Sequence, residues 1–379
     1  MRACGSLVTA LVLLSAVAGC SDADHAATPE PSVDAALPRV SLEVAQGDAP
    51  AEYALSWASG QAFDVYVATS PDASLSEATQ LASDATSPFR WQAEDTSERR
   101  YFSLARDGVV MTTAAMRLLP LEGGRNFRDL GGYETSDGQR VRWGRVFRSG
   151  AMHKLTAADY EFLGKLGIAT VCDYRAEAER QRQPTQWAAE GAEYLTFPDP
   201  EDTAGSSFMT VFKDPEITPA KVSDAMAAGY ASIAKQHAPA YAAMFDRLAA
   251  GEIPLAFNCS AGKDRAGMSA ALLLTALGVP RETVVEDYAL SEQYVDYMAE
   301  FLDDEEASAE TATEPDPYAF LKQLPREVVA PLMRSDPKYV TQALDDLEAE
   351  FGSLDAFIRD ELEVTEAELR SIKAALLES

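Results

Sequence analysis

The sequence predicts an α/β protein with a central, largely parallel sheet flanked by helices and preceded by a smaller N-terminal β-sandwich. Three observations carry this prediction. Strand patterns alternate with helical patterns through residues 119–379, and period-two alternation fills residues 38–118. A buried strand, a tight loop and a helix also follow one another around position 259. The length of 379 residues suits two such domains.

The first 37 residues read as an export segment. Residues 1–19 resemble a secretory signal, because a basic start precedes an apolar run, Leu7 to Val17, that is too short to span a bilayer. The run ends in Val17-Ala18-Gly19-Cys20, which resembles the lipobox of bacterial lipoproteins and implies a lipid on Cys20; an ordinary signal cleaved nearby is the alternative. Residues 20–37 are polar and predict a flexible tether. The expected product is an exported lipoprotein, anchored at the membrane and facing the periplasm or cell surface.

Residues 38–118 predict a β-sandwich of short strands with turns between them. Apolar and polar residues alternate in Tyr53–Trp57, Phe63–Val67 and Tyr101–Leu104, and Asp107-Gly108 is a hairpin signal. The segment weakly resembles a fibronectin type III module. It contains no catalytic or metal-binding pattern, so we interpret it as a spacer or an interaction module.

Residues 119–379 alternate between helical and strand patterns. Helices are expected from a capping box at Thr156 to Leu166, and over 219–235, 239–250, 268–277 and 281–301, with a last one opening at Thr365. Buried strands are expected at 168–172, 194–197 and 253–257, and the acidic stretch 302–318 is expected to be a surface loop. Parallel strands joined by helices place ligands at the carboxyl ends of the strands, which is where the loop at 259 would lie.

The loop from Cys259 to Arg265 carries the chemistry. A strand, a tight loop and a helix N-terminus aim several backbone N–H groups at one point, and such a cradle binds a phosphate dianion. The same field favours a thiolate at Cys259, and Arg265 can hold two phosphate oxygens at once. A lone cysteine at a strand end is usually a small buried hydrophobe. A Walker loop is excluded, because Asp264 stands where a magnesium-binding Ser or Thr is required.

The segment Gly262-Lys263-Asp264-Arg265 resembles the signature loop of the cysteine-dependent protein tyrosine phosphatase superfamily, and in particular the atypical bacterial tyrosine/phosphoinositide phosphatases. Three further blocks support the resemblance over about residues 119–379: Asn126 to Tyr133, Gly144 to Ser149, and Ile168 to Arg175, which ends in Asp173-Tyr174-Arg175. One position departs from the pattern, because Asn258 replaces the histidine that normally precedes the nucleophile. We expect this change to weaken or shift activity without abolishing it.

The resemblance implies phosphomonoester hydrolysis through a phosphocysteine. Cys259 is the implied nucleophile and Arg265 the implied phosphate ligand. The remaining loop residues are implied to bind substrate: Ser260, Ala261, Gly262, Lys263, Ala266 and Gly267. No metal or other cofactor is needed for this chemistry. The scattered histidines His25, His153 and His237 argue against metal-dependent and phosphohistidine phosphatases.

The general acid has three candidates. Asp173 is the first, by its match to the family motif, with the alternative that it only caps or pairs with Arg175. Asp264 in the loop is the second, and Asp199 is the third by position alone. Lys263 would favour polyanionic head groups, or would simply be a solvated loop lysine. Oxidation could also link Cys172 to Cys259 and protect the nucleophile, although a buried strand cysteine is the simpler interpretation.

The partners follow from charge and family. Acidic residues outnumber basic ones by 61 to 32, for a net charge of −29, which excludes nucleic acid as a partner and leaves membrane association to the lipid anchor. The expected activity is that of a protein tyrosine phosphatase or dual-specificity phosphatase, with a phosphorylated protein as its substrate. A phosphoinositide or inositol phosphate is the alternative. An alternative of another class is a catalytically weak pseudophosphatase that binds phosphorylated ligands, which the Asn258 departure makes conceivable.

Overall fold

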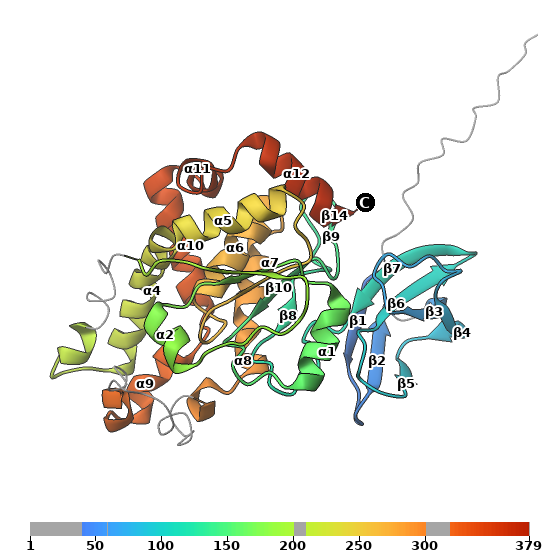
Figure 1. Ribbon diagram of the computed structural model, residues 1–379, viewed down its shortest axis with the longest axis horizontal. Coiled ribbons are helices and arrows are strands. Elements are labelled where there is room, and N and C mark those ends of the chain that lie inside the picture. Colours follow the sequence, from blue (N-terminus) through green and yellow to red (C-terminus); the bar gives the residue numbers. More distant parts are fainter. Residues whose placement is uncertain (1–39, 59, 201–209, 301–318, 379) are drawn as a thin grey trace, which may run out of the picture. The chain divides into compact units, whose positions relative to one another are not determined.

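Five strands form the central sheet of the C-terminal region, in the order β12-β11-β13-β10-β8 (Figure 1). The strands from β12 to β10 are parallel, and β8 runs antiparallel to β10 at the edge. Their bounds are β8 (Arg128–Asp129), β10 (Val146–Ser149), β11 (Thr170–Asp173), β12 (Glu193–Thr196) and β13 (Leu255–Asn258). A separate pair joins β9 (Arg140–Val141) to β14 (Leu377–Glu378). The prediction of a largely parallel sheet is confirmed.

The computed structural model describes residues 40–58, 60–200, 210–300 and 319–378. The predicted signal, Cys20 and the tether lie outside the described residues, as does the whole acidic stretch 302–318. No helix among the described residues is long and apolar enough to cross a membrane.

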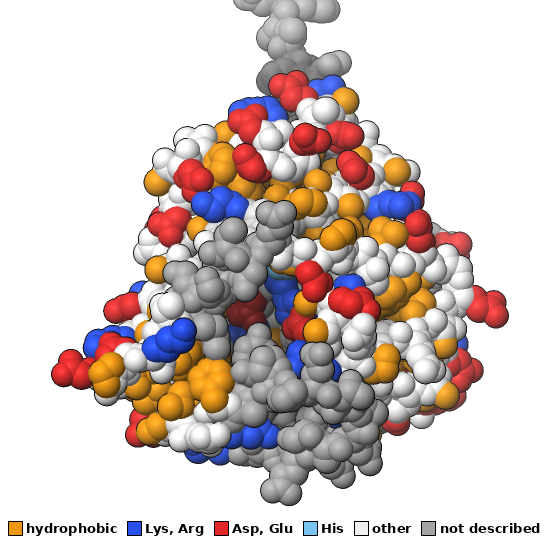
Figure 2. Space-filling model, turned by 60° about the vertical axis from the view of Figure 1, so that its left-hand side comes forward, with side chains coloured by type: hydrophobic (Ala, Val, Ile, Leu, Met, Phe, Trp, Pro, Cys, Tyr) orange, Lys and Arg blue, Asp and Glu red, His pale blue; other side chains and the backbone are white. Residues whose placement is uncertain are grey.

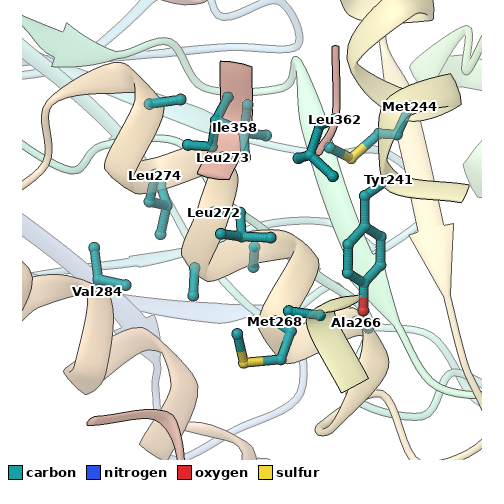
Figure 3. Close-up of a cluster of buried hydrophobic side chains, with 14 of the residues drawn as sticks. Tyr241, Met244, Ala266, Met268, Leu272, Leu273, Leu274, Val284, Ile358 and Leu362 are labelled. Carbon is teal, nitrogen blue, oxygen red and sulfur yellow. The ribbon is translucent and has the colours of Figure 1, made fainter. Parts of the chain in front are cut away.

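Helices cover both faces of the central sheet. On one face, Phe162 and Leu163 of α1 pack with Val171 and Ala256 of the sheet. On the other, side chains of α4, α5, α6 and α10 form the larger core, part of which Figure 3 shows around Leu272. The helices are α1 (Ala157–Leu166), α2 (Glu177–Arg182), α4 (Pro219–Gln236), α5 (Ala238–Ala249), α6 (Arg265–Leu277), α7 (Arg281–Ala289), α8 (Ser291–Tyr294), α9 (Arg326–Met333), α10 (Pro337–Phe351), α11 (Leu354–Asp360) and α12 (Glu366–Leu376), with 3-10 turns η1 (Thr210–Lys213) and η4 (Ala319–Gln323).

Local capping sets several helix ends where the sequence predicts them. Helix α1 opens on a capping box between Thr156 and Asp159, and α12 opens on one between Thr365 and Glu368. Helix α6 ends at Gly278, whose φ of 90° is the left-handed conformation that glycine adopts at little cost.

The stretch predicted as one helix over 281–301 is divided in the structure. Helix α7 ends at Ala289 and α8 at Tyr294, where Val295 turns to extended backbone. The break brings the Tyr297 hydroxyl to the Ala261 carbonyl oxygen, 2.9 Å away. This contact across the fold outweighs the local helical preference.

Seven antiparallel strands form two sheets in the N-terminal region, with the orders β1-β2-β5 and β4-β3-β6-β7. The strands are β1 (Leu42–Gln46), β2 (Glu52–Trp57), β3 (Ala62–Ala68), β4 (Thr79–Thr86), β5 (Phe89–Gln92), β6 (Tyr101–Arg106) and β7 (Val109–Ala115). Alternate side chains of β2 and β3 are buried, as their sequence pattern predicts. Asp107 and Gly108 turn the β6–β7 hairpin with φ of 52° and 75°. The resemblance to a fibronectin type III module stays a prediction.

Buried polar contacts join these strands to the C-terminal region within the single compact unit 39–379. Arg99 donates to the Asp129 carboxylate at 2.8 Å, and both side chains are buried. Trp143 packs in the core of the N-terminal strands and donates from Nε1 to the Thr113 carbonyl at 3.1 Å. The N-terminal strands are therefore packed against the C-terminal region, and the boundary at 118/119 stays a prediction.

Candidate active site

The loop from Cys259 to Asp264 lies at the carboxyl end of β13 and leads directly into α6. The backbone passes close to the end of β10 at this point. A Cβ on Gly262 would lie 2.5 Å from the Gly150 nitrogen, and the φ of Gly262 is 75°. Only glycine fits this position without moving the backbone. The loop is thus closed against the end of β10, and it lies at the carboxyl end of a strand as the sequence predicts.

Donors from outside the loop hold its carbonyl oxygens. The Ser260 oxygen accepts from Arg125 Nη1 and the Ala151 amide, both at 3.0 Å. Tyr297 binds the Ala261 oxygen, as described above. The Gly262 oxygen accepts from Asn126 Nδ2 and Arg148 Nη2, also at 3.0 Å each.

With the carbonyls fixed on the outside, the peptide planes turn their N–H groups to the inside of the loop. Cys259 lies there, nearly fully buried, and its Sγ accepts the Gly262 amide at 3.2 Å. The loop is therefore a nest of N–H groups built around a thiol, which is the arrangement that an anionic phosphoryl group requires.

Two buried arginines and one carboxylate support the loop from behind. Arg148 Nη1 lies 2.6 Å from Asp287 Oδ2, and Arg128 Nε lies 3.4 Å from the other oxygen. Tyr133 donates to the same carboxylate at 2.8 Å. Burial alone would raise the pKa of Asp287, but the two guanidinium charges outweigh it and hold that pKa well below its usual range. The motif blocks around Asn126 and Arg148 thus supply the loop's anchors, a role that the sequence did not show.

Glu179 orients Arg265, and sequence reasoning missed it. Arg265 donates to Glu179 through Nη1 at 2.5 Å and Nη2 at 2.8 Å, and Ser260 Oγ donates to the same carboxylate at 2.5 Å. Burial would raise the pKa of Glu179, but the Arg265 charge and these hydrogen bonds lower it to about 2. Glu177 is an equally acidic neighbour in the same helix, so the sequence offered no signal that singles out Glu179.

Asp173 lies beside the loop but is enclosed. Its carboxylate accepts Arg175 Nε and Nη2 at 2.7–3.0 Å, and it also accepts the Tyr194 hydroxyl at 2.7 Å. Asn258 Nδ2 donates to it at 3.0 Å, and the side chain has no exposed surface. Asn258 is thus directed at Asp173, and its own Oδ1 is buried with no hydrogen-bond partner among the described residues. The pairing with Arg175 that the sequence left open is present.

Asp264 keeps about a quarter of its side chain exposed at the start of α6. The Tyr230 hydroxyl donates to its Oδ1, and Lys263 Nζ lies 3.2 Å from the same oxygen. Asp199, by contrast, lies on the surface and accepts the Glu177 amide at the start of α2 at 2.8 Å. Asp264 is therefore the candidate acid that combines a place in the loop with solvent access.

The other predicted loop residues are buried. Lys263 is buried, and its ammonium donates to the carbonyl oxygens of Leu332 and Arg334 at the end of α9, both at 2.9 Å. Ala266 is buried in the first turn of α6. A Cβ on Gly267 would lie 2.9 Å from the Tyr288 ring, so glycine permits that packing. Lys263 is thus not a solvated loop lysine, because its ammonium is buried against carbonyl oxygens of α9.

Cys172 is a free, buried thiol on β11 and pairs in register with Phe257, two residues before Cys259. One step across the sheet and two along it place the Cα atoms of the two cysteines about 8 Å apart, beyond the reach of a disulfide. Burial also raises the pKa of Cys172 to about 12. The geometry favours the buried strand cysteine over the oxidative link.

A cavity of about 500 Å³ adjoins the loop through Arg125. Its lining includes both basic and acidic residues, among them His153, Lys154 and Asp296. Figure 2 shows a hollow on one face of the molecule in which basic and acidic side chains lie side by side.

Comparison with known proteins decides the family. The model of the tyrosine phosphatase family matches residues 119–378. The chain belongs to the tyrosine phosphatase family. It is therefore a phosphatase, a hydrolase of phosphoric monoesters, as the loop predicts.

Two curated relatives support this assignment. The chain is 36% identical over 248 residues to a candidate tyrosine-protein phosphatase of Cupriavidus necator, covering 65% of this chain and 84% of that protein. It is 29% identical over 286 residues to the triple specificity protein phosphatase PtpB of Mycobacterium tuberculosis, covering 69% of this chain and 99% of that protein. The family match begins at residue 119, after the N-terminal strands of this phosphatase.

Proposed function

We propose that this phosphatase works through a phosphocysteine intermediate formed on Cys259. The observation that carries the proposal is the loop itself, in which the carbonyls are held from outside and the Gly262 N–H donates to the buried Sγ. Sulfur attacks phosphorus while the loop N–H groups and Arg265 stabilise the equatorial oxygens. The pair with Glu179 keeps Arg265 in one orientation, so little rearrangement is needed when substrate arrives.

We propose Asp264 as the general acid. Asp173 was the first candidate from the sequence, but its carboxylate is buried and engaged by Arg175, Tyr194 and Asn258. A proton donor must reach the leaving oxygen directly or through one water, and Asp264 is the partly exposed carboxylate of the loop. After protonating the leaving group, the same carboxylate would take a proton from the water that hydrolyses the phosphocysteine.

We propose phosphotyrosine-bearing protein as the substrate class, supported by the family and by the names of its relatives. An inositol phosphate or phosphoinositide is the alternative. Lys263 is the residue that would favour such polyanionic groups, and its ammonium is buried against carbonyl oxygens of α9.

The test compares wild type with Cys259→Ser, as full chains in detergent with chelator and reductant present. Phosphate release would be measured from para-nitrophenyl phosphate, a phosphotyrosine peptide and inositol phosphates. We expect turnover that Cys259→Ser abolishes, fastest on the peptide. Faster turnover of inositol phosphates would favour the alternative substrate. A folded wild type that binds phosphopeptide without turnover would indicate the pseudophosphatase.

We further propose that the phosphatase is an exported lipoprotein held by a lipid on Cys20, supported by the sequence of its first 20 residues. Metabolic labelling with an alkyne fatty acid should mark the wild type and not Cys20→Ser. Equal labelling of both would contradict the anchor.

A further inference from the structure

Two buried tyrosine hydroxyls form a chain that ends on Asp264. Tyr230 of α4 donates to Asp264 Oδ1, and the Tyr288 hydroxyl of α7 lies 2.6 Å from that of Tyr230. Both side chains are fully buried. Burial, and then the charge of Asp264, raise the pKa of both tyrosines well above the ordinary value. Both hydroxyls therefore keep their protons and remain donors.

The hydrogen bonds from Tyr288 through Tyr230 to Asp264 all donate in one direction when Asp264 is ionised. A carboxylate only accepts, so the single proton of Tyr230 goes to Oδ1, and Tyr288 donates to the Tyr230 oxygen. Lys263 Nζ approaches the same Oδ1 at 3.2 Å. Across the described residues, the structure gives Oδ2 of Asp264 no protein donor. The two oxygens of one carboxyl group are thus differently occupied.

Packing fixes the Tyr230 hydroxyl in place. Its ring lies 5.9 Å from that of Tyr288, nearly perpendicular to it, and 5.5 Å from that of Tyr339. Tyr339 is itself held by a 2.9 Å hydrogen bond to the Pro331 carbonyl. The donor to Oδ1 cannot turn away without repacking α4 against α7 and α10.

We propose that Tyr230 is a positioning residue for proton transfer: by occupying Oδ1, it places the transferable proton of Asp264 on Oδ2. This inference rests on the proposed role of Asp264. In the first step the S–P bond forms, the P–O bond breaks, and the Oδ2 proton goes to the leaving oxygen. In the second, water attacks phosphorus, the S–P bond breaks, and a proton of the water returns to Oδ2.

The groups that influence Asp264 come from several elements, and each enters the pH dependence. They are Lys263 and Arg265 of the loop and α6, Tyr230 of α4, Tyr241 of α5, Tyr288 of α7, and Tyr297 after α8. Among the hydroxyls of this set, Tyr230 alone has a hydrogen bond to the Asp264 carboxylate in the described part of the chain. Replacing Tyr230 therefore removes one donor and leaves the other charges in place.

The test is Tyr230→Phe in the full chain, assayed on para-nitrophenyl phosphate and on phenyl phosphate. The first leaving group needs little protonation and the second depends on it. We expect kcat to fall less than about twofold on the first and about tenfold on the second. The alkaline limb of the phenyl phosphate profile should move to higher pH, because the lost hydrogen bond favoured the charged carboxylate.

Tyr339→Phe is the matched control, because it packs on the same ring and has no hydrogen bond to Asp264. It should affect both substrates alike. Should Tyr230→Phe fail to fold, 3-fluorotyrosine at position 230 keeps the ring's shape and makes the hydroxyl a stronger donor. That substitution should move the alkaline limb to lower pH.

Equal losses on both substrates, with an unmoved pH profile, would overturn the proposal and leave Tyr230 a packing role. Asp264→Asn, run beside it, separates this from failure of the proposed acid. If Asp264→Asn also lowered kcat equally on both substrates, the assignment of Asp264 as the acid would be wrong. If Asp264→Asn lowered kcat more on phenyl phosphate and Tyr230→Phe did not, only the proposed role of Tyr230 would be wrong.

Discussion

The charged residues on the two sides of the phosphate loop differ in burial. Behind it, Arg128, Arg148 and Asp287 are fully buried and bind carbonyl oxygens or one another. In front, Arg265 and Asp264 keep 20% and 27% of their side chains exposed. The rear is an interior network that gives the loop its shape. The front is a set of charges that can meet a substrate and exchange protons with it.

Motif residues of one family therefore serve two purposes: those behind the loop give it its shape, and those in front meet the substrate. A buried charge that loses its partner destabilises the fold, whereas a partly exposed charge can be changed with little effect on stability. Substitutions behind the loop should therefore lower stability first. Substitutions in front should lower turnover and leave the folded state nearly intact.

The largest effect is expected behind the loop, for Arg148→Met. This change leaves Asp287 with one guanidinium partner and the Gly262 carbonyl with one donor. We expect the free energy of unfolding to fall by about 3–5 kcal/mol. Urea denaturation followed by circular dichroism measures it. A loss below about 1 kcal/mol would erase the distinction between the two sides.

In front of the loop, Glu179→Gln is expected to have a smaller effect, and to lower turnover more than stability. The neutral amide no longer holds Arg265 by charge, so kcat/KM should fall about ten- to hundredfold. The free energy of unfolding should change by about 1 kcal/mol or less. Glu177→Gln in the same helix is the matched control, since it contacts only Arg180 and Gln181 side chains among the described residues. Equal effects of the two substitutions would contradict the role of Glu179.

A third effect concerns pH and His237, at the junction of α4 and α5. Burial, and then the charge of Arg265, lower the pKa of His237 to about 4 from 6.5. Below pH 6.5 the unfolded chain takes up a proton that the folded chain refuses, so stability is lost as pH falls toward 4. Over that window wild type should lose roughly 2 kcal/mol more than His237→Gln. Parallel stability curves would show that His237 titrates alike in both states.

The sequence predicts correctly those elements that depend on a local pattern of residues. The strand, loop and helix around Cys259, the capping boxes at Thr156 and Thr365, and the Asp107-Gly108 hairpin depend on neighbouring residues, and all are present. Strand β4 was not predicted, because its side chains are mostly exposed and lack apolar alternation. It forms by pairing with β3, which no local pattern reveals.

The directions of the site's side chains could not be predicted in the same way. Asp173 and Asp264 both lie within two residues of a motif arginine in the sequence, and their partners from distant elements give them different surroundings. Tyr194 closes the first within the sheet, while Tyr230 leaves the second partly open. The position of Lys263 depends likewise on the end of α9, some 70 residues further along the chain.

We propose that the front of the loop supplies the proton through Asp264. The most direct measurement compares Asp264→Asn with Asp173→Asn for the dependence of kcat on the leaving group, across aryl phosphates of graded phenol acidity. We predict that Asp264→Asn loses about a hundredfold or more on phenyl phosphate and far less on activated esters. Asp173→Asn should lose stability and keep the wild-type dependence. The reverse pattern would contradict this assignment and would mean that Asp173 is the general acid.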